Sequence, residues 1–376
     1  MSEVDPAVWG ARAASIPAIE RELARLHRAA FAHAKERGQS VARASVLNLV
    51  VYAEREVHAR RSARVVSHLA LRHPSRAVVI LADERAYTGP SLALHCLVPS
   101  AGEFEQVSYE QVLAHVHGDY DERVASVVIP LLVPDLPVFV WWTGTPRCET
   151  RHFNDLVDLA DRLIVDSADF ARPDRTLPEI ARLVRHRSAV TDLNWARLTA
   201  WRELVAQFFD VPAWRPFLDA ITGVRVGFAV DMDGREIHPS QALLVVGWLA
   251  SRLGWRQVES LAPSEAGGLL FRVARADGAP IMLRVRPRFE RGLEEGDVSG
   301  LRIQAARGGE TAEFVLKRAP DERHVTATVI VGGVRRAARI VPLPPLGIDQ
   351  LLGEELTIAG SDRVYEDALA ALLSLA

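Results

Sequence analysis

The sequence has few of the residues that cross-link small domains, and none of its apolar runs is long. Cys96 and Cys148 are the only cysteines among 376 residues, and they form no Cys-x-x-Cys pair. A disulfide scaffold and a four-cysteine zinc site are therefore excluded. Apolar runs such as 127–133 and 138–142 are far shorter than the roughly 20 residues that span a bilayer. Because Met1 to Gly10 also lacks the pattern of a secretory signal, we expect a cytoplasmic protein with no membrane partner.

A surplus of basic charge is also absent. The chain has 45 Lys and Arg residues against 48 Asp and Glu residues, which gives a formal net charge of −3. A protein that mainly binds nucleic acid usually carries a basic surplus, so we expect no nucleic acid partner. With 49% hydrophobic residues the chain can bury a large core, and its length predicts two domains.

Sequence motifs of common enzymes are missing as well. The chain contains no glycine-rich dinucleotide fingerprint, no phosphate-binding loop, no zinc-protease motif and no hydrolase nucleophile motif. We therefore expect no catalytic residues and no cofactor. An α/β domain can nevertheless bind a ligand where its strand order reverses. The alternative hypothesis is a sugar-phosphate- or nucleotide-binding enzyme whose site lies at the C-terminal strand ends, near Trp142 and Asp166.

Apolar patterning in residues 1–220 predicts an α/β domain, Rossmann-like, with a mostly parallel sheet and helices. The pattern predicts helices at 17–37, 54–71, 109–115, 154–160, 177–184 and 197–209. Continuous apolar segments predict strands at 46–52, 77–81, 91–98, 138–142 and 162–165. Buried strands that alternate with helices are typical of a parallel sheet covered on both faces.

The pattern changes in residues 221–376, which predict an α+β domain with an antiparallel sheet. Alternating segments predict strands at 224–230, 269–274, 280–285, 301–306, 313–317, 325–331 and 336–341. Breaks at Asp277-Gly278, Gly308-Gly309 and Gly332-Gly333 are typical of hairpin turns. Helices are predicted at 240–253 and 362–375.

One group of His and Asp residues has the spacing of metal ligands. His115, His117, Asp119 and Asp121 alternate along the chain, and alternate residues of an extended segment share one face. The other interpretation places the histidines at the C-terminal end of a helix, where the helix dipole favours them. We favour the second interpretation and predict no metal site.

Arginines and cysteines each allow two interpretations too. Arg284, Arg286 and Arg288 share one strand face and could bind an anion or an acidic partner. A solvated sheet face explains the same pattern, and we favour it. Cys96 and Cys148 could respond to redox conditions, but distant cysteines are more often buried small hydrophobic residues.

Tryptophan and arginine residues cluster in two segments, and these clusters indicate a function more specifically than the groups above do. Trp141 and Trp142 end a predicted strand, and the turn that follows reaches Arg147. The second segment contains Asp192, Asn194, Trp195, Arg197, Trp201 and Arg202. Trp and Arg are enriched at the centres of protein interfaces. The tryptophans could instead fill the space between sheet and helices. We predict that both segments lie on, or support, a partner-binding surface.

Several of these segments resemble a known family. Residues 128–142, Val-Ile-Pro-Leu-Leu-Val-Pro-Asp-Leu-Pro-Val-Phe-Val-Trp-Trp, are similar to a motif of the OpcA family, the glucose-6-phosphate dehydrogenase assembly proteins. Further similar segments follow the family order at 73–76, 161–167, 192–202 and 247–255. The resemblance extends over essentially the whole chain. The motifs at 128–142 and 192–202 are its most specific parts.

The resemblance implies a bacterial protein that is not an enzyme. It implies a non-catalytic assembly factor and allosteric regulator that binds glucose-6-phosphate dehydrogenase, promotes its active oligomer and changes its kinetics in the oxidative pentose phosphate pathway. In photosynthetic bacteria the family is linked to thioredoxin-dependent control. Because Cys96 and Cys148 are far apart in this sequence, we expect reductant to have little effect.

Overall fold

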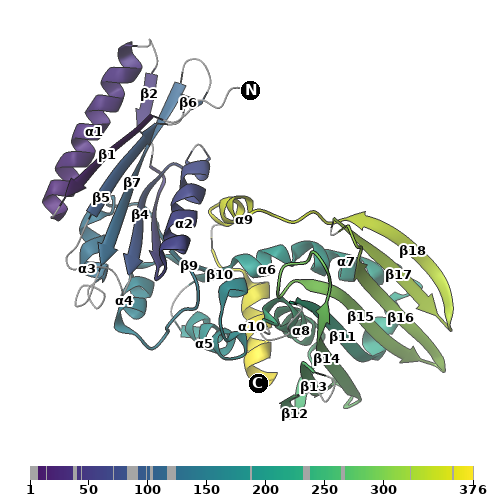
Figure 1. Cartoon of the computed structure of the whole chain (residues 1–376). Coiled ribbons are helices and arrows are strands. Elements are labelled where there is room, and N and C mark those ends of the chain that lie inside the picture. Colours follow the sequence, from purple (N-terminus) through teal and green to yellow (C-terminus); the bar gives the residue numbers. More distant parts are fainter. Residues whose placement is uncertain are drawn as a thin grey trace. The chain divides into compact units, whose positions relative to one another are not determined.

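The chain forms two compact units. A computed structural model describes residues 7–13, 15–36, 40–43, 45–70, 72–82, 92–98, 100–101, 105–116, 124–186, 189–231, 238–263, 267–321, 323–357 and 360–375. Unit 1 comprises Met1–Asp166, Arg187–Thr191 and Ile348–Gly360. Unit 2 comprises Ser167–His186, Asp192–Gly347 and Ser361–Ala376. The two units are coloured along the chain in Figure 1.

Unit 1 is built on a mostly parallel sheet. Its strands are β1 Ala7–Ala13, β2 Ser40–Arg43, β3 Leu47–Ala53, β4 Ser75–Ala82, β5 Leu92–Val98, β6 Ser100–Ala101, β7 Glu105–Val116, β8 Val138–Trp142, β9 Arg162–Val165 and β10 Ala189–Asp192. The order is β1-β5-β7-β4-β3-β8-β9-β10, with β2 and β6 paired to β7. The central pairs from β7 through β9 are parallel, whereas β5 is antiparallel to both β1 and β7. The predicted Rossmann-like sheet is confirmed.

Helices cover this sheet on both faces. They are α1 Ile16–Glu36, α2 Glu56–Leu69, α3 Val124–Val128, the short 3₁₀ helix η2 Ile129–Leu131, α4 Arg151–Leu159 and α9 Ile348–Glu355. Every residue of β3 and β4 is buried. This burial explains why residues 49–53 and 77–82 are continuously apolar in the sequence instead of alternating.

Residues 109–115 were predicted as a helix, and that prediction is wrong. They belong to strand β7, which lies between β4 and β5. Val112, Ala114 and Val116 are buried at every second position, which is the period of a strand. Pairing on both sides outweighs the helix-forming residues of the segment. His115 is therefore in a strand and not at a helix end, while 117–123 lie outside the described residues.

Unit 2 is built on a second, mostly antiparallel sheet, as predicted. Its strands are β11 Ile221–Val230, β12 Arg256–Pro263, β13 Leu269–Ala274, β14 Pro280–Phe289, β15 Val298–Arg307, β16 Glu310–Arg318, β17 His324–Val331 and β18 Val334–Pro342. The order is β12-β13-β14-β11-β15-β16-β17-β18, and only the β11–β14 pair within it is parallel among the described strands. The turn glycines Gly308 and Gly309 have φ of 60° and 80°, as a tight hairpin turn requires.

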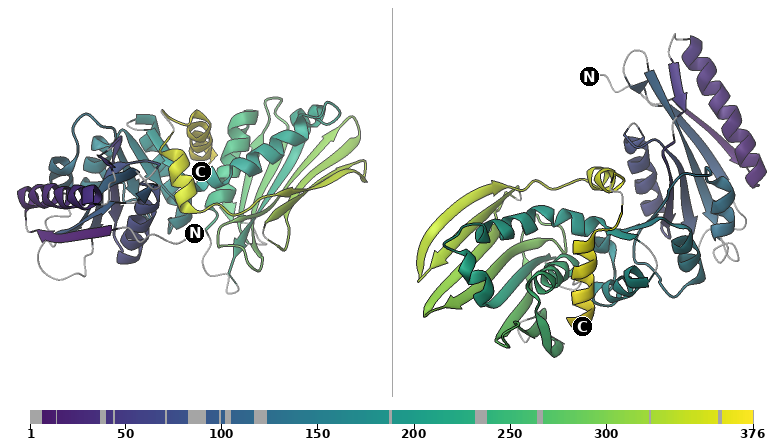
Figure 2. Two further views of the ribbon diagram at one scale, coloured as in Figure 1. Left: turned by 90° about the horizontal axis from the view of Figure 1, so that it is seen from above. Right: turned by 180° about the vertical axis from the view of Figure 1, so that it is seen from behind.

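The helices of unit 2 are η3 Ser167–Asp169, α5 Pro173–His186, α6 Leu193–Arg197, α7 Thr199–Phe209, η4 Arg215–Ala220, α8 Ser240–Leu253 and α10 Arg363–Leu375. Of these, α7, η4, α8 and α10 pack against strands of the sheet, with helices gathered on one face of it (Figure 2), and η3, α5 and α6 pack against α8. Helix α8 packs closely against α10, because a Cβ atom at Gly247 would lie 2.4 Å from the carbonyl oxygen of Ala368. Only glycine allows this approach.

The compact units do not coincide with the expected sequence domains of residues 1–220 and 221–376. Unit 2 already begins at Ser167, because α5 packs against the C-terminal helix α10. Unit 1 in turn includes α9, which packs against α2. The chain therefore enters each unit more than once.

Candidate functional site

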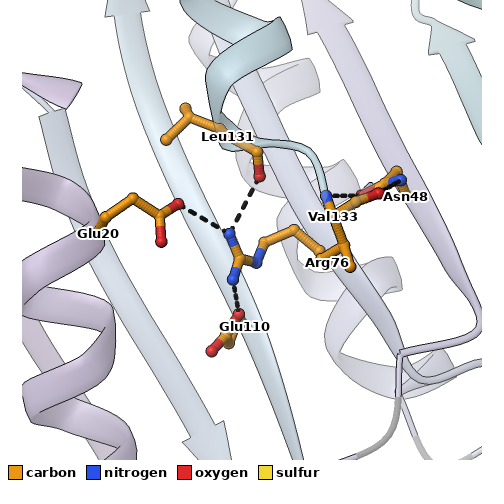
Figure 3. Close-up of polar contacts among 6 residues, drawn as sticks. All are labelled: Glu20, Asn48, Arg76, Glu110, Leu131 and Val133. Atoms are coloured by element: carbon orange, nitrogen blue, oxygen red, sulfur yellow. Dashed lines mark hydrogen bonds and ion pairs between the residues drawn. The ribbon is translucent and has the colours of Figure 1, made fainter. Parts of the chain in front are cut away.

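Two buried polar side chains hold the proline-rich motif of residues 128–142 in place (Figure 3). Asn48 of β3 accepts a hydrogen bond from the backbone N–H of Val133 at 2.8 Å, and its Nδ2 donates to the Val133 carbonyl at 3.0 Å. Arg76 of β4 donates to the Leu131 carbonyl at 3.0 Å and pairs with Glu110 at 2.5 Å. The motif is therefore anchored from within unit 1.

The tryptophans of the same motif belong to the core of unit 1. Trp141 is 1% exposed and Trp142 is fully buried. The Trp142 ring stacks on Tyr52 with centroids 4.0 Å apart and meets Phe153 edge-on at 4.9 Å. Neither side chain offers accessible surface to a partner in this conformation. They can therefore contribute to a binding surface only by packing beneath the residues that form it.

Arg147 is the part of this segment that reaches solvent. Its side chain is 42% exposed and pairs with Glu54 at 2.8 Å. Cys148 beside it is half-buried, and its carbonyl accepts a hydrogen bond from Asn154. Cys96 lies on strand β5, but its side chain is outside the described part of the chain. A redox role for the two cysteines stays a prediction.

The carboxyl ends of β3 and β8 are filled by side chains of unit 1. The rings of Tyr52, Trp142 and His152 stack there, with centroids 4.0 to 5.8 Å apart. The Thr143 hydroxyl donates to the Tyr52 carbonyl at 2.9 Å. This is the place where a doubly wound sheet usually binds its ligand.

In unit 2, the segment 192–202 begins with a buried carboxylate. Asp192 is 1% exposed, and its Oδ1 accepts from the backbone N–H groups of Asn194 and Ser167, each at 2.9 Å. It thereby caps α6 and holds the first residue of η3. The Tyr365 hydroxyl donates to Asp192 Oδ2 at 3.4 Å. Burial first, and the charge of Asp192 second, raise the pKa of Tyr365, so the phenol keeps its proton.

From Asp192 a chain of amides continues inward. Asn194 Nδ2 donates to the Ser167 hydroxyl at 3.2 Å, and Asn194 Oδ1 accepts from Gln241 at 3.0 Å. Gln241 Nε2 also donates to Asp297 at 2.9 Å, and its Oε1 accepts from the backbone N–H of Val298 at 2.8 Å. Each group of this buried network is bonded, which specifies one arrangement of the elements that supply it.

Trp195 and Arg202 brace each other within the same segment. Trp195 is 4% exposed, and its Nε1 donates to Asp362 at 2.8 Å. The Arg202 guanidinium lies 3.5 Å from the centroid of the Trp195 ring and donates to the Trp195 carbonyl at 2.8 Å. Stacking and hydrogen bonding of this kind fix the guanidinium in place.

Arg197 and Trp201 instead line a cavity of about 340 Å³. The other lining residues are Ala200, Gln241, Gly292, Leu293, Glu294, Asp297, Arg318, Pro342, Leu343, Pro344, Pro345 and Leu346. Burial raises the pKa of Asp297, although Arg318 and Arg197 act in the opposite direction. The cavity joins a desolvated carboxylate, two guanidinium groups and an indole, and it can take a small polar molecule.

Sequence reasoning missed Gln241, Asp297 and Arg318. Gln241 carried the one usable signal, because it is a polar residue in the first turn of a helix whose next nine residues are apolar. Asp297 and Arg318 lie on hairpin strands and turns that only the fold brings to the cavity.

Metal-binding clusters and membrane-spanning helices are both absent from the part of the chain that the structure describes. Those residues include no group of three or more His, Cys, Asp or Glu side chains placed to hold a metal ion. None of their helices is long and apolar enough to cross a membrane.

Comparison with known families identifies the class of protein first. Two family models match, and they are described as the N-terminal domain and the C-terminal domain of a "Glucose-6-phosphate dehydrogenase subunit". The first matches residues 66–182 and the second matches residues 188–369. The chain belongs to the OpcA family, as its motifs indicated.

Curated relatives carry the same name. The "Putative OxPP cycle protein OpcA" of Synechocystis sp. is 28% identical over 324 residues, which are 83% of this chain and 65% of that protein. The protein of the same name from Nostoc punctiforme is 32% identical over 199 residues, which are 52% of this chain and 42% of that protein. The chain thus spans less than two thirds of the length of these two relatives.

Solved structures resemble the chain only distantly. An NAD binding oxidoreductase from Klebsiella pneumoniae is 13% identical, with a TM-score of 0.43 over 87% of this chain and 96% of that chain. A WlbA dehydrogenase from Thermus thermophilus is 10% identical, with a TM-score of 0.42 over 87% and 94%. A likeness at this level carries no argument about activity.

Proposed function

We propose that the chain is a non-catalytic subunit that binds glucose-6-phosphate dehydrogenase, promotes its active oligomer and changes its kinetics. One observation carries the proposal. Two family models, both described as domains of a glucose-6-phosphate dehydrogenase subunit, match the chain in succession. The relatives' printed name, an OxPP cycle protein, agrees with a role beside that enzyme.

The interior of unit 1 supports a role other than catalysis. The place where a doubly wound sheet usually binds a nucleotide is filled by stacked rings of Tyr52, Trp142 and His152. A sugar-phosphate or nucleotide site at those strand ends would require these rings to move. The alternative of an enzyme with its site there is therefore the weaker one.

The predicted partner-binding residues take two parts in this proposal. Those that are buried would support the contact surface from inside; they are Trp141, Trp142, Asp192, Asn194, Trp195 and Trp201. Those that are partly exposed are candidates for direct contact; they are Arg147, Arg197 and Arg202. Trp141 to Arg147 belong to unit 1 and Asp192 to Arg202 to unit 2, so each segment needs its own test.

The experiment combines the purified chain with the dehydrogenase of the same organism. Sedimentation would measure association and oligomeric state, and glucose-6-phosphate saturation curves would measure kinetics with and without the chain. We expect a larger assembly and a changed curve, and no turnover by the chain alone. Normal folding of both proteins with no association and an unchanged curve would refute the proposal.

A further inference from the structure

The face of the unit 2 sheet that its described helices leave uncovered carries a row of arginines. In the strand register, Arg225 of β11 lies opposite Arg284 of β14 on one side and opposite Arg302 of β15 on the other. Ile281, Leu283 and Val285 of β14 point into the core. The alternate residues, Arg284 among them, therefore point away from the helices.

Two more arginines extend the row along β14. Arg286 and Arg288 follow Arg284 at every second position and lie opposite Gly227 and Ala229 of β11. We call these five residues the arginine face; they are Arg225, Arg284, Arg286, Arg288 and Arg302. Lys317, one of only two lysines in the chain, lies opposite Gly300 beside it.

This crowding is unfavourable for the chain alone. Like charges directly opposite each other destabilise a sheet. Burial and then the charges of the four neighbouring arginines lower the pKa of Arg225. The Nε atoms of Arg225 and Arg286 are buried with no hydrogen-bond partner among the described residues. Arg302 is partly neutralised, since it pairs with Glu313 at 3.3 Å.

Glycines open a hollow in the middle of these cations. Gly227 and Gly300 lie opposite each other across β11 and β15 and form its floor. The hollow has a volume of about 180 Å³, and its charged lining residues are four cations, Arg225, Arg288, Arg302 and Lys317, and one carboxylate, Glu290. A Cβ atom at Gly227 would lie 2.8 Å from the Ser299 hydroxyl, so a side chain there would displace its neighbour. The glycine is thus required by close packing, and it is the hollow itself that gives a carboxylate room beside Arg225, Arg288 and Arg302.

We propose that the arginine face is the surface on which an acidic segment of the dehydrogenase docks, with a carboxylate in the glycine-floored hollow. The inference rests on the proposed function, which names the partner. Arg–carboxylate contacts are often bidentate and stronger than neutral hydrogen bonds. Neutralising the row would also remove the repulsion that the free chain carries.

The extent of the face favours a protein segment over one small anion. Two strand spacings separate Arg284 from Arg302, about 10 Å, and four residues separate Arg284 from Arg288, about 13 Å. One phosphate reaches only part of this area, whereas several carboxylates on a protein surface can reach all of it. The face also continues over neutral, half-buried side chains such as Val315 and Thr328. Such a mixture of arginines and neutral side chains is typical of protein interfaces.

The test is a charge reversal with a matched control. Arg284→Glu with Arg288→Glu reverses two charges of the face, and Arg363→Glu reverses an exposed charge on α10, away from the sheet. We expect the double variant to bind the dehydrogenase roughly thirtyfold more weakly or worse, at ~1.4 kcal/mol per tenfold. The control should bind as the parent does. Raising the salt concentration should weaken the parent complex much more than that of the double variant.

The outcomes separate this inference from the proposed function. If the folded parent does not bind the dehydrogenase, the proposed function fails, and the inference fails with it. If the parent binds and the folded double variant binds equally well, only the inference fails. If the double variant melts early, Arg284→Gln with Arg288→Gln replaces it, with the same expected direction. Binding of duplex DNA is a further control. If the parent binds DNA as tightly as it binds the dehydrogenase, and the double variant does not bind DNA, the inference is also overturned.

A single substitution distinguishes a docking surface from a structural one. Arg225→Gln removes the middle charge of the row and relieves repulsion on both sides. We expect the melting temperature of the free chain to stay level or rise while the affinity for the dehydrogenase falls several-fold. A lower melting temperature with unchanged affinity would show that the row serves the fold, and would contradict the inference.

Discussion

The two tryptophan-rich segments look alike in sequence but differ in what surrounds them. In unit 1, Trp141 and Trp142 pack in a core of rings with one exposed arginine, Arg147, beyond them. In unit 2, Trp195 is tied by its N–H to a carboxylate and by its ring to a guanidinium. Trp and Arg together do not by themselves indicate a contact surface. The neighbouring polar groups decide whether a tryptophan fills space or positions a site.

The largest effect should come from the core of unit 1. Trp142→Ala removes the ring that stacks on Tyr52 and meets Phe153, and we expect a loss of about 3–5 kcal/mol in unfolding free energy. Denaturant unfolding would measure it. Arg147→Ala is the matched control, because an exposed ion pair contributes only about 0–1 kcal/mol. Equal losses of unfolding free energy in the two variants would show that the buried Trp142 and the exposed Arg147 do not differ in their contribution to stability.

A smaller but clear effect should follow from the cap in unit 2. Asp192→Ala leaves the backbone N–H groups of Asn194 and Ser167 buried without their acceptor. We expect a loss of about 2–3 kcal/mol, measured by the same method. Asp192→Asn keeps an acceptor oxygen and should lose much less. If Asn is as harmful as Ala, the negative charge of Asp192, and not its two hydrogen bonds, stabilises the start of α6 and of η3.

Variants of Arg202 and Arg197 should distinguish a structural role from a role in binding the dehydrogenase. Arg202→Ala removes the stacking on Trp195 and a hydrogen bond to its carbonyl, and we expect about 1–2 kcal/mol of lost stability. Arg197→Ala, at the cavity, should change stability by about 0.5 kcal/mol or less. Melting curves and binding of the dehydrogenase would be measured for both. Weakened binding by stable Arg197→Ala would make the cavity rim part of the contact, and unchanged binding would exclude it.

The smallest effect concerns pH. Burial raises the pKa of Asp297 above its ordinary value of 3.8, so the folded chain holds this proton more tightly than the unfolded chain does. Stability from this group is therefore present below about pH 3.8 and is lost as pH rises through the raised pKa. Asp297→Asn should melt slightly higher than the parent at neutral pH, and the difference should narrow toward about pH 4. If the difference in melting temperature between Asp297→Asn and the parent widens on acidification, the pKa of Asp297 is lowered and not raised by folding.

Local patterns were enough for some elements and not for others. The predicted strands at 138–142 and 162–165 and the helix at 240–253 have the bounds found in the structure. Pro137 precedes the first strand, Asp161 and Asp166 flank the second, and Pro239 and Gly254 flank the helix, so local residues mark the ends. Strand β7 was missed because its pairing partners, not its own residues, determine its conformation.

The same limit applies to the sites. The alternation of Arg284, Arg286 and Arg288 is visible in the sequence, and it places them on one face of a strand. That Arg225 and Arg302 join them depends on β11 lying between β14 and β15, which no local pattern contains. Gln241 and Asp297 likewise meet across 56 residues. Sites assembled by long-range pairing leave little trace in a single sequence.

The path of the chain near its C-terminal end has a consequence for synthesis. After Gly347 the chain leaves unit 2, supplies helix α9 to unit 1, and returns with α10 to unit 2. Arg162 donates hydrogen bonds to the carbonyls of Glu355 and Gly360, which ties this late segment to an early strand. A ribosome that has translated as far as Gly347 has therefore completed neither unit, so the last steps of folding in both units must wait for residues 348–375 to be made.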